Sequence, residues 1–267
     1  MFNFNLTPTV RNLLLINLAV LLVQQNLRAL PVDQWGSLYP LGSPYFHFWQ
    51  FFTHMFMHSG WGHFFANMFG LISFGPLLEQ RWGSQRFLAF WLMCGVGAGV
   101  FYEGVRTYEL HQFEVSYAEV ARNPDAGEFK QLMQKVGDQN LEDYAAGDAL
   151  ARNPSDRVLQ QAVAQRAAEL YNGVLTSPYA GMLGASGALF GVLFAFAYLF
   201  PNTELMLLFI PFPVKAVYLV FLYGMYELYA GIHQAAGDHV AHFAHIGGLL
   251  VGFIIIKFWE GGRTRFY

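Results

Sequence analysis

The chain has 267 residues, of which 55% are hydrophobic and only 12% are charged. Soluble domains usually carry about 25% charged residues, so this composition excludes an ordinary soluble domain and predicts an integral membrane protein. The formal net charge of -3 does not identify a partner. The sequence contains no basic patch suited to nucleic acid, so we expect no nucleic-acid partner.

Charged residues are concentrated in one block. Residues 106–175 contain seven of the fifteen Lys and Arg and eleven of the eighteen Asp and Glu. Strongly apolar sequence lies on both sides of this block. We therefore predict three parts, which are a membrane core over 1–105, a polar helical insertion over 106–179 and a second part of the membrane core over 180–267.

Six stretches have the apolar character of membrane spans, each of which needs about 20 residues. In chain order they are 10–30, 61–80, 85–105, 184–201, 205–229 and 240–258. Within the first, Asn17 and Gln24–Gln25 must face protein or the membrane interface. Because no clear small-residue cleavage site follows it, this first stretch is interpreted as a retained span. The predicted fold class is an all-α membrane protein with six transmembrane helices.

Basic residues in the short loops predict the orientation of these spans. With six spans, both termini lie on one side, and only Arg28 marks the opposite side. The positive-inside rule makes the side with more cations cytoplasmic. That side has Arg11, Arg81, Arg86, Lys215, Lys257, Arg263 and Arg265. We expect a bacterial plasma (inner) membrane, both termini in the cytoplasm and an extracytoplasmic insertion.

The insertion has a helical pattern. The motif "ARNP" occurs at 121–124 and at 151–154. Each copy offers Asn as an N-cap with Pro at the first helical position. This predicts two to four short helices lying on the membrane surface, and the insertion could dock a partner or a substrate.

Polar side chains recur at the outer ends of three spans. His63 and Asn67 begin the second span, Ser186 begins the fourth and His245 begins the sixth. Under the predicted topology these positions lie at a similar depth, a little below the outer surface. Ionisable residues inside a span are costly and are functional candidates by default. His63 and Asn67 are four residues apart and therefore share one helix face.

These residue types have the chemistry of a serine hydrolase. A neutral imidazole can take the hydroxyl proton of Ser186 during attack and return it to a leaving amine. The resulting oxyanion needs preorganised donors, which His63, Asn67 and the Ser186 backbone N–H would supply. The sequence therefore predicts a nucleophile that cleaves peptide bonds inside a membrane.

Small residues and one aromatic ring support this site. Gly187 and Gly191 on the fourth span, and Gly248 and Gly252 on the sixth, have the spacing that lets helices approach closely. A short Ser–His hydrogen bond requires such an approach. Phe190, one turn after Ser186, could pack against the imidazole and fix its plane. Cys94 is interpreted as a packing residue.

Two alternatives concern the same histidines. His242 lies three residues before His245 on a similar face and could be the base instead. Asp238 is about 10 Å along a helix from His245, which is too far for a third triad member.

A metal site in the membrane is an alternative interpretation of the histidines. The possible zinc ligands are His54, His58 and His63, or His239, His242 and His245. Because no H-E-x-x-H motif is present, and apolar glycine packing is a poor environment for a dication, we expect no metal and no cofactor.

Five motifs in this order resemble the rhomboid intramembrane serine proteases. They are "HMFMHSGWGHFFANM", "LLEQRWGSQRF", "GASGALFG", "IPFPVKAVYLVF" and "AHFAHIGGLLVG". The resemblance implies a six-helix bundle that cleaves transmembrane segments of membrane proteins in the lipid bilayer. It also implies lateral substrate entry between the second and fifth spans. A catalytically inactive rhomboid-like binding protein is the alternative.

The resemblance also implies roles for individual residues. Ser186 is the nucleophile and His245 its base, as a dyad without a carboxylate. The oxyanion positions are His63 and Asn67. The remaining matched positions are His54 and His58, which order the first outer loop, and Glu79 and Gly83, which form a structural E-x-x-x-G. Two departures from the family pattern are Phe190 in place of Tyr and Gln50 in place of Arg.

Overall fold

A computed structural model describes residues 6–27, 29–138, 140–178, 180–206, 212–233 and 240–261. The side chain of Val136 is not described. Arg28, Asp238, His239, Arg263 and Arg265, which entered the sequence interpretation, lie outside the described residues. The chain forms two compact units. Unit 1 comprises 1–38, 47–102 and 181–267, and unit 2 comprises 39–46 and 103–180.

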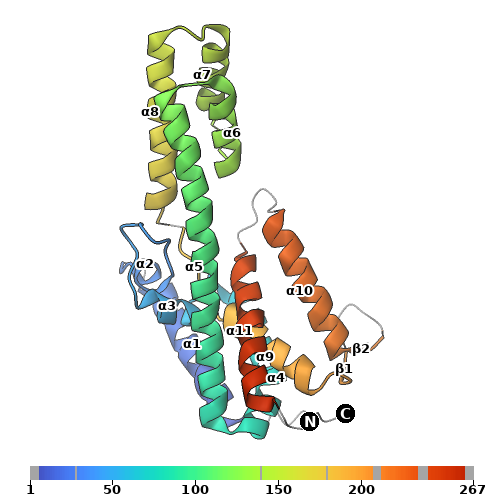
Figure 1. Ribbon diagram of the computed structural model, residues 1–267. Helices are drawn as coiled ribbons and strands as arrows, with labels where there is room; N and C mark the ends of the chain where they lie inside the picture. The colour runs from blue at the N-terminus through green and yellow to red at the C-terminus, as the bar shows by residue number, and fades with distance from the viewer. Residues whose placement is uncertain are drawn as a thin grey trace. The chain divides into compact units, whose positions relative to one another are not determined.

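Unit 1 is built from helices that correspond to the six apolar stretches (Figure 1). They are α1 (Pro8–Asn26), α4 (Trp61–Trp82), the first half of α5 (Ser84–Arg122), α9 (Ser186–Leu199), α10 (Ala216–Ile232) and α11 (His242–Glu260). The segment between α1 and α4 contains the short helices α2 (Val32–Gly36), α3 (Gln50–Thr53) and η1 (His54–Phe56).

Two differences from the predicted spans stand out. The fifth stretch was predicted over 205–229, but α10 begins only at Ala216. Before it, β1 (Glu204–Leu205) pairs antiparallel with β2 (Val214–Lys215), so the all-α prediction is wrong at this small ribbon. Pro213 accounts for the absence of helix at Phe212, because proline disfavours helical geometry in the residue before it.

Two helices in the described part of the chain are long and apolar enough to cross a membrane, namely α5 and α11. α9 and α10 are apolar but shorter. At 1.5 Å per residue, the 14 residues of α9 span about 21 Å, against a hydrocarbon thickness of about 30 Å. The membrane-spanning character is therefore clearest in two helices, and the count of six spans stays a prediction.

The core of unit 1 lies where α4 and α9 pack against their neighbours. Leu13 of α1, Leu71 of α4 and Val192 of α9 are all buried in this cluster. Of the three polar side chains that were expected to avoid lipid in α1, Asn17 and Gln24 are buried and Gln25 is half-buried. Asn17 donates from Nδ2 to the Leu13 carbonyl at 2.7 Å. Gln24 donates from Nε2 to the His58 carbonyl at 3.1 Å.

The inner part of this bundle is tied by two carboxylates. Glu79 accepts hydrogen bonds from Thr9 N at 2.8 Å and from Val10 N at 3.0 Å, and so caps the N-terminus of α1. Glu260 of α11 accepts from Arg81 and from the Trp82 indole of α4. These contacts give Glu79 the structural function that its motif implied.

Unit 2 contains its own hydrophobic core. It consists of the second half of α5 with α6 (Ala126–Val136), α7 (Leu141–Arg152) and α8 (Arg157–Thr176) (Figure 1). The buried side chains are Phe113, Val120, Phe129, Leu132, Met133, Leu150, Val163 and Ala167. These helices thus pack on one another, and their placement on a membrane surface stays a prediction.

The helix starts in unit 2 correct the interpretation of "ARNP". Asp125 is the N-cap of α6 and accepts from Gly127 N and Glu128 N. Asp156 is the N-cap of α8 and accepts from Val158 N and Leu159 N. The Asn-Pro pairs instead follow the ends of α5 and α7, because proline removes the preceding residue from the helical region.

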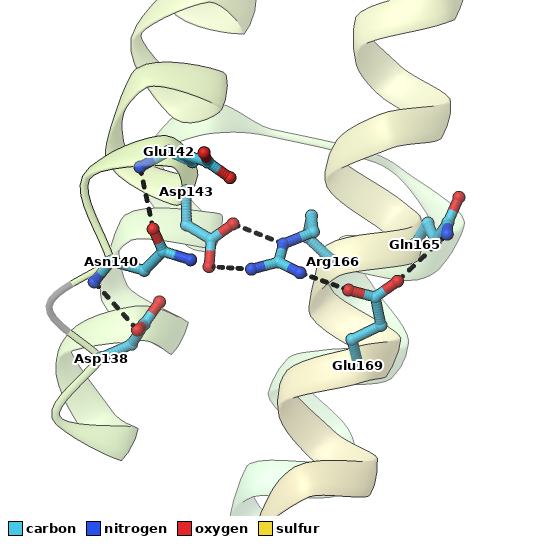
Figure 2. Close-up of polar contacts among 7 residues, drawn as sticks. All are labelled: Asp138, Asn140, Glu142, Asp143, Gln165, Arg166 and Glu169. Carbon is cyan, nitrogen blue, oxygen red and sulfur yellow. Dashed lines mark hydrogen bonds and ion pairs between the residues drawn. The ribbon is translucent and has the colours of Figure 1, made fainter.

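A partly buried ion pair joins two helices of unit 2 (Figure 2). The Arg166 guanidinium of α8 donates to both carboxylate oxygens of Asp143 on α7, at 2.5 and 2.7 Å. Arg166 also pairs with Glu169, one turn along α8. Asp143 is buried, and its hydrogen bonds to Arg166 hold the pKa of this carboxyl below its usual range. The pair therefore fixes α7 against α8 while both groups are charged.

Candidate active site

Ser186 is the first residue of α9 and lies two residues after Gly184, a glycine with a positive φ. Gly184 has a φ of +134°, which L-residues with a side chain rarely adopt. Its amide donates to the His54 carbonyl at 2.9 Å, and Met182 pairs with Leu38 in an isolated bridge. The chain before Ser186 is thus anchored to the segment between α1 and α4. Because Ser186 lies in the first turn of a helix, its backbone N–H has no intrahelical acceptor and is available to another partner.

Ser186 and His245 are in hydrogen-bonding contact. The Ser186 Oγ lies 2.8 Å from the His245 Nε2, and His245 is 7% exposed. His245 belongs to the first turn of α11, so the two residues come from helix starts that are far apart in sequence. Phe190 stacks on the imidazole with ring centroids 4.2 Å apart and an angle of 9° between the planes. Phe190 thus packs against the imidazole as expected, although it lacks the hydroxyl that a tyrosine would have at this position.

Glycines bring the two helices together. A Cβ added to Gly248 would lie 1.9 Å from the Gly187 carbonyl oxygen, and one added to Gly252 would lie 3.0 Å from the Gly191 Cα. The small-residue faces that were expected on α9 and α11 therefore contact each other. Cys94 packs at the same crossing, with its Sγ 2.5 Å from a Cβ added to Gly191. This agrees with its interpretation as a packing residue.

A carboxylate that the sequence interpretation omitted also contacts the imidazole. Glu227 of α10 is 2% exposed, and its Oε2 lies 2.8 Å from the His245 Nδ1. This corrects the expectation of a pair without a carboxylate. Asp238 was considered only because it is near His245 in sequence, whereas the contact comes from a neighbouring helix. A signal existed, because Glu227 is an ionisable residue inside an apolar stretch.

His242 lies on the other side of the same carboxylate. Its Nδ1 is 2.6 Å from the Glu227 Oε2, and it is 2% exposed. The structure therefore places His245 beside Ser186 and brings His242 to Glu227.

Glu227, His242 and His245 also offer three potential metal-ligand atoms within 4.8 Å of one another. Two ligands of one tetrahedral zinc ion lie about 3.3 Å apart. The separations of 2.6 and 2.8 Å are instead those of hydrogen bonds. The arrangement thus fits a shared hydrogen-bond acceptor better than a cation site.

The two expected oxyanion residues lie on the outer turns of α4. The His63 ring approaches Gly184, since a Cβ added there would lie 3.0 Å from the His63 Nε2 and 3.5 Å from the Ser186 Oγ. Ser59 N donates to the His63 Nδ1 at 3.4 Å, so in the neutral ring the proton is on Nε2. Nε2 is thereby a donor close to the serine.

Asn67 lies one turn further along α4 and is 4% exposed. Its Nδ2 is buried, and within the described residues no acceptor is paired with it. Buried amide donors are nearly always hydrogen-bonded. The Asn67 amide is thus an unsatisfied donor on the same face of α4 as His63. An anionic intermediate would need such a donor.

The segment before α4 is held by buried polar side chains. His54 donates from Nδ1 to the Gln50 carbonyl at 2.8 Å. Burial lowers the pKa of His54 to about 4 and that of His58 to about 4, so both rings are neutral at neutral pH. The His58 ring contacts the His63 ring edge-on at 5.2 Å. His54 is therefore a backbone anchor, and His58 supports the ring of His63.

Gln50 is a departure from the family pattern with a clear structural function. It is fully buried, donates from Nε2 to the Gln34 carbonyl at 2.9 Å and accepts from His47 N at 3.1 Å. The segment thus keeps an anchor at this position without an arginine. Among the contacts described, His233 bonds locally to the Tyr229 carbonyl.

Comparisons with known proteins place the chain in a family. A family model described as the Rhomboid domain matches residues 45–110 and 157–259, which is well over half of the chain. Residues 111–156, which the model leaves unmatched, lie within unit 2.

Two fungal proteins are similar to the chain. Rhomboid protein 1, mitochondrial, of Saccharomyces cerevisiae is 41% identical over 86 residues, which are 31% of this chain and 25% of that protein. An uncharacterized mitochondrial rhomboid protein of Schizosaccharomyces pombe is 25% identical over 225 residues, which are 79% of this chain and 52% of that protein. The chain thus spans a quarter to a half of these relatives. Both are named as mitochondrial, which disagrees with the expected bacterial membrane.

Proposed function

This chain belongs to the rhomboid family of integral membrane proteins, and from that premise we propose that it is an intramembrane serine endopeptidase. The observation that carries the proposal is the 2.8 Å contact between the Ser186 Oγ and the His245 Nε2. An alcohol paired with an imidazole at the meeting of two apolar helices is a nucleophile with its base. Its substrates are the transmembrane segments of other proteins.

The reaction follows from the atoms in place. The Ser186 Oγ attacks the scissile carbonyl carbon while His245 Nε2 takes the hydroxyl proton. The tetrahedral oxyanion accepts hydrogen bonds from the Asn67 Nδ2, the His63 Nε2 and the Ser186 backbone N–H. The C–N bond then breaks as His245 returns the proton to the leaving amine. A water molecule repeats these steps to release the acyl group.

The length of α9 supports a nucleophile beneath the membrane surface. If its C-terminus reaches one boundary of the hydrocarbon, its 14 residues leave Ser186 about 9 Å short of the other. A peptide bond in that layer is reached only if the substrate helix is locally unwound, because an intact helix shields its carbonyls. Substrate spans with Gly or Pro near this depth are therefore preferred. Six spans with cytoplasmic termini complete this proposed topology.

The test is Ser186→Ala in the full chain, reconstituted in liposomes with a single-pass reporter whose span contains a Gly-Ala pair near its outer end. We expect wild type to cleave the reporter and the variant to be inactive. A fluorophosphonate probe should label wild type and not the variant. Cleavage by the variant at the wild-type rate would overturn the proposal. A wild type that binds the reporter and neither cleaves it nor takes the probe would indicate an inactive binding protein instead.

A further inference from the structure

One oxygen atom of Glu227 contacts two histidines that the proposed mechanism treats differently. The Nδ1 of His242 is 2.6 Å and the Nδ1 of His245 is 2.8 Å from the Glu227 Oε2. All three side chains are buried, and they come from α10 and α11. A buried carboxylate in an apolar helix is costly unless it is hydrogen-bonded, so two donors on one oxygen indicate a built arrangement.

The contact determines the tautomer of His245. An ionised carboxylate only accepts hydrogen bonds, so the Nδ1 of each histidine bears a proton. In neutral His245 the Nε2 then has a free lone pair, and this atom faces the Ser186 hydroxyl at 2.8 Å. Only this tautomer can take the serine proton. The opposite tautomer would present a second donor to the hydroxyl and would be inactive.

The same carboxylate stabilises the charge that develops during attack. When His245 takes the serine proton, it becomes an imidazolium with Glu227 at hydrogen-bonding distance. The proton moves from the Ser186 Oγ to the His245 Nε2, and Glu227 stays ionised throughout. Phe190 fixes the plane of the ring from one face, and Glu227 fixes its rotation within that plane.

His242 accounts for the orientation of Glu227 itself. A glutamate side chain has three rotatable bonds, and one hydrogen bond to His245 would leave it able to turn away. The second bond, from a histidine one turn earlier on α11, holds the same oxygen in position. This gives His242 a function although it does not touch the serine.

We propose that Glu227 is a positioning residue of the proposed protease site, and that His242 orients it. The array runs from Ser186 through His245 to Glu227 and His242, with the carboxylate supplied by α10. The inference rests on the proposed function and adds to the serine and histidine a carboxylate and the residue that holds it.

The experiment compares Glu227→Gln, Glu227→Asp and His242→Gln in the full chain with the same liposome reporter. Glu227→Gln removes the charge with little change in shape. We expect kcat to fall about 10²- to 10⁴-fold, by comparison with the loss of the orienting carboxylate in a serine protease triad. KM should stay within about twofold, because substrate binding is unaffected. Glu227→Asp should recover part of kcat, and His242→Gln should lose about 10- to 100-fold.

The matched control is Glu260→Gln. This glutamate is also buried and hydrogen-bonded in α11, but it bonds to Arg81 and Trp82 at the opposite end of the helix. We expect its kcat to equal that of wild type. The fluorophosphonate labelling rate of Ser186 should fall with kcat in Glu227→Gln and be unchanged in the control.

A spectroscopic measurement keeps the inference testable if a variant does not fold. ¹⁵N-histidine NMR of the wild-type protein should show His245 protonated at Nδ1. Protonation at Nε2 in the neutral ring would overturn the inference, as would wild-type kcat in folded Glu227→Gln. Loss of wild-type activity on chelation would also overturn it, in favour of a metal. Failure of the proposed function is separate, since it would appear as cleavage by Ser186→Ala.

Discussion

At the scale of single residues, Asn67 has a buried side-chain donor with no acceptor among the described residues. A buried donor without an acceptor costs about 1–3 kcal/mol in the resting protein. Asn67 Nδ2 is such a donor among the described residues, whereas Asn17 Nδ2 is bonded to the Leu13 carbonyl. In the proposed mechanism, the Asn67 amide gains its partner when the oxyanion forms, and an interaction made only in the transition state would accelerate the reaction.

Replacing Asn67 by alanine should therefore lower kcat by about 10²- to 10³-fold, equivalent to about 2.7–4 kcal/mol of transition-state stabilisation. KM should change little. Steady-state cleavage of the liposome reporter measures both constants. Asn17→Ala is the matched control, as a buried asparagine in α1 that does not contact the site. Equal kcat values for the two variants would remove Asn67 from the proposed oxyanion site.

At the scale of elements, the approach of α9 to α11 makes the site possible. The backbone of Gly187 occupies the space that a side chain at Gly248 would need, at 1.9 Å. Rigid backbone atoms cannot rotate away, so the helices themselves would have to separate. Overpacking of this kind costs about 1–3 kcal/mol or more. A displacement of about 1 Å between reacting groups can cost 10²-fold in rate.

Gly248→Ala should accordingly reduce cleavage at least about 100-fold and slow the fluorophosphonate reaction at Ser186. Its thermal unfolding temperature should also fall. Gly173→Ala is the control, because a Cβ added to this glycine of α8 meets no atom within 4 Å. If Gly248→Ala retained full activity, the close helix crossing would not be what positions Ser186 and His245.

At the scale of the whole molecule, unit 2 has a core of its own. None of the residues proposed for catalysis lies in it, and its buried side chains form a cluster separate from that of unit 1. We therefore expect the proposed protease chemistry not to depend on the packing of unit 2. A function of this unit in substrate selection or partner binding stays a prediction.

Deletion of 110–175, with a short Gly-Ser linker in its place, tests this division. We expect the kcat on a minimal single-span reporter to stay within about threefold of wild type, because the site residues and their core are retained. The relative rates on reporters with different outer domains should change more. Competition assays with pairs of reporters measure this selection. Loss of cleavage on all reporters would show that unit 2 is needed for folding.

Much of the site was predictable because its residue types are chemically unusual where they occur. Ser186, His245, His63 and Asn67 are polar groups at the ends of apolar stretches, and the predicted topology together with their spacing led us to expect them at one depth. The helix starts of α4, α9 and α11 agree closely with that prediction, at Trp61, Ser186 and His242. Helix starts in unit 2 were predicted less well, since Asn-Pro and Asp two or three residues later are both plausible N-caps.

The sequence by itself determined that this is an apolar helical membrane protein, and it predicted a serine, a histidine and two donors for one reaction. That information is local, because hydropathy and helical periodicity are properties of neighbouring residues. Only the tertiary structure decided which carboxylate reaches the imidazole, and which of His242 and His245 faces the serine. Glu227 is 18 residues from His245 and on another helix, so their 2.8 Å contact depends on how α10 packs against α11. Spacing along one chain contains no measure of that distance.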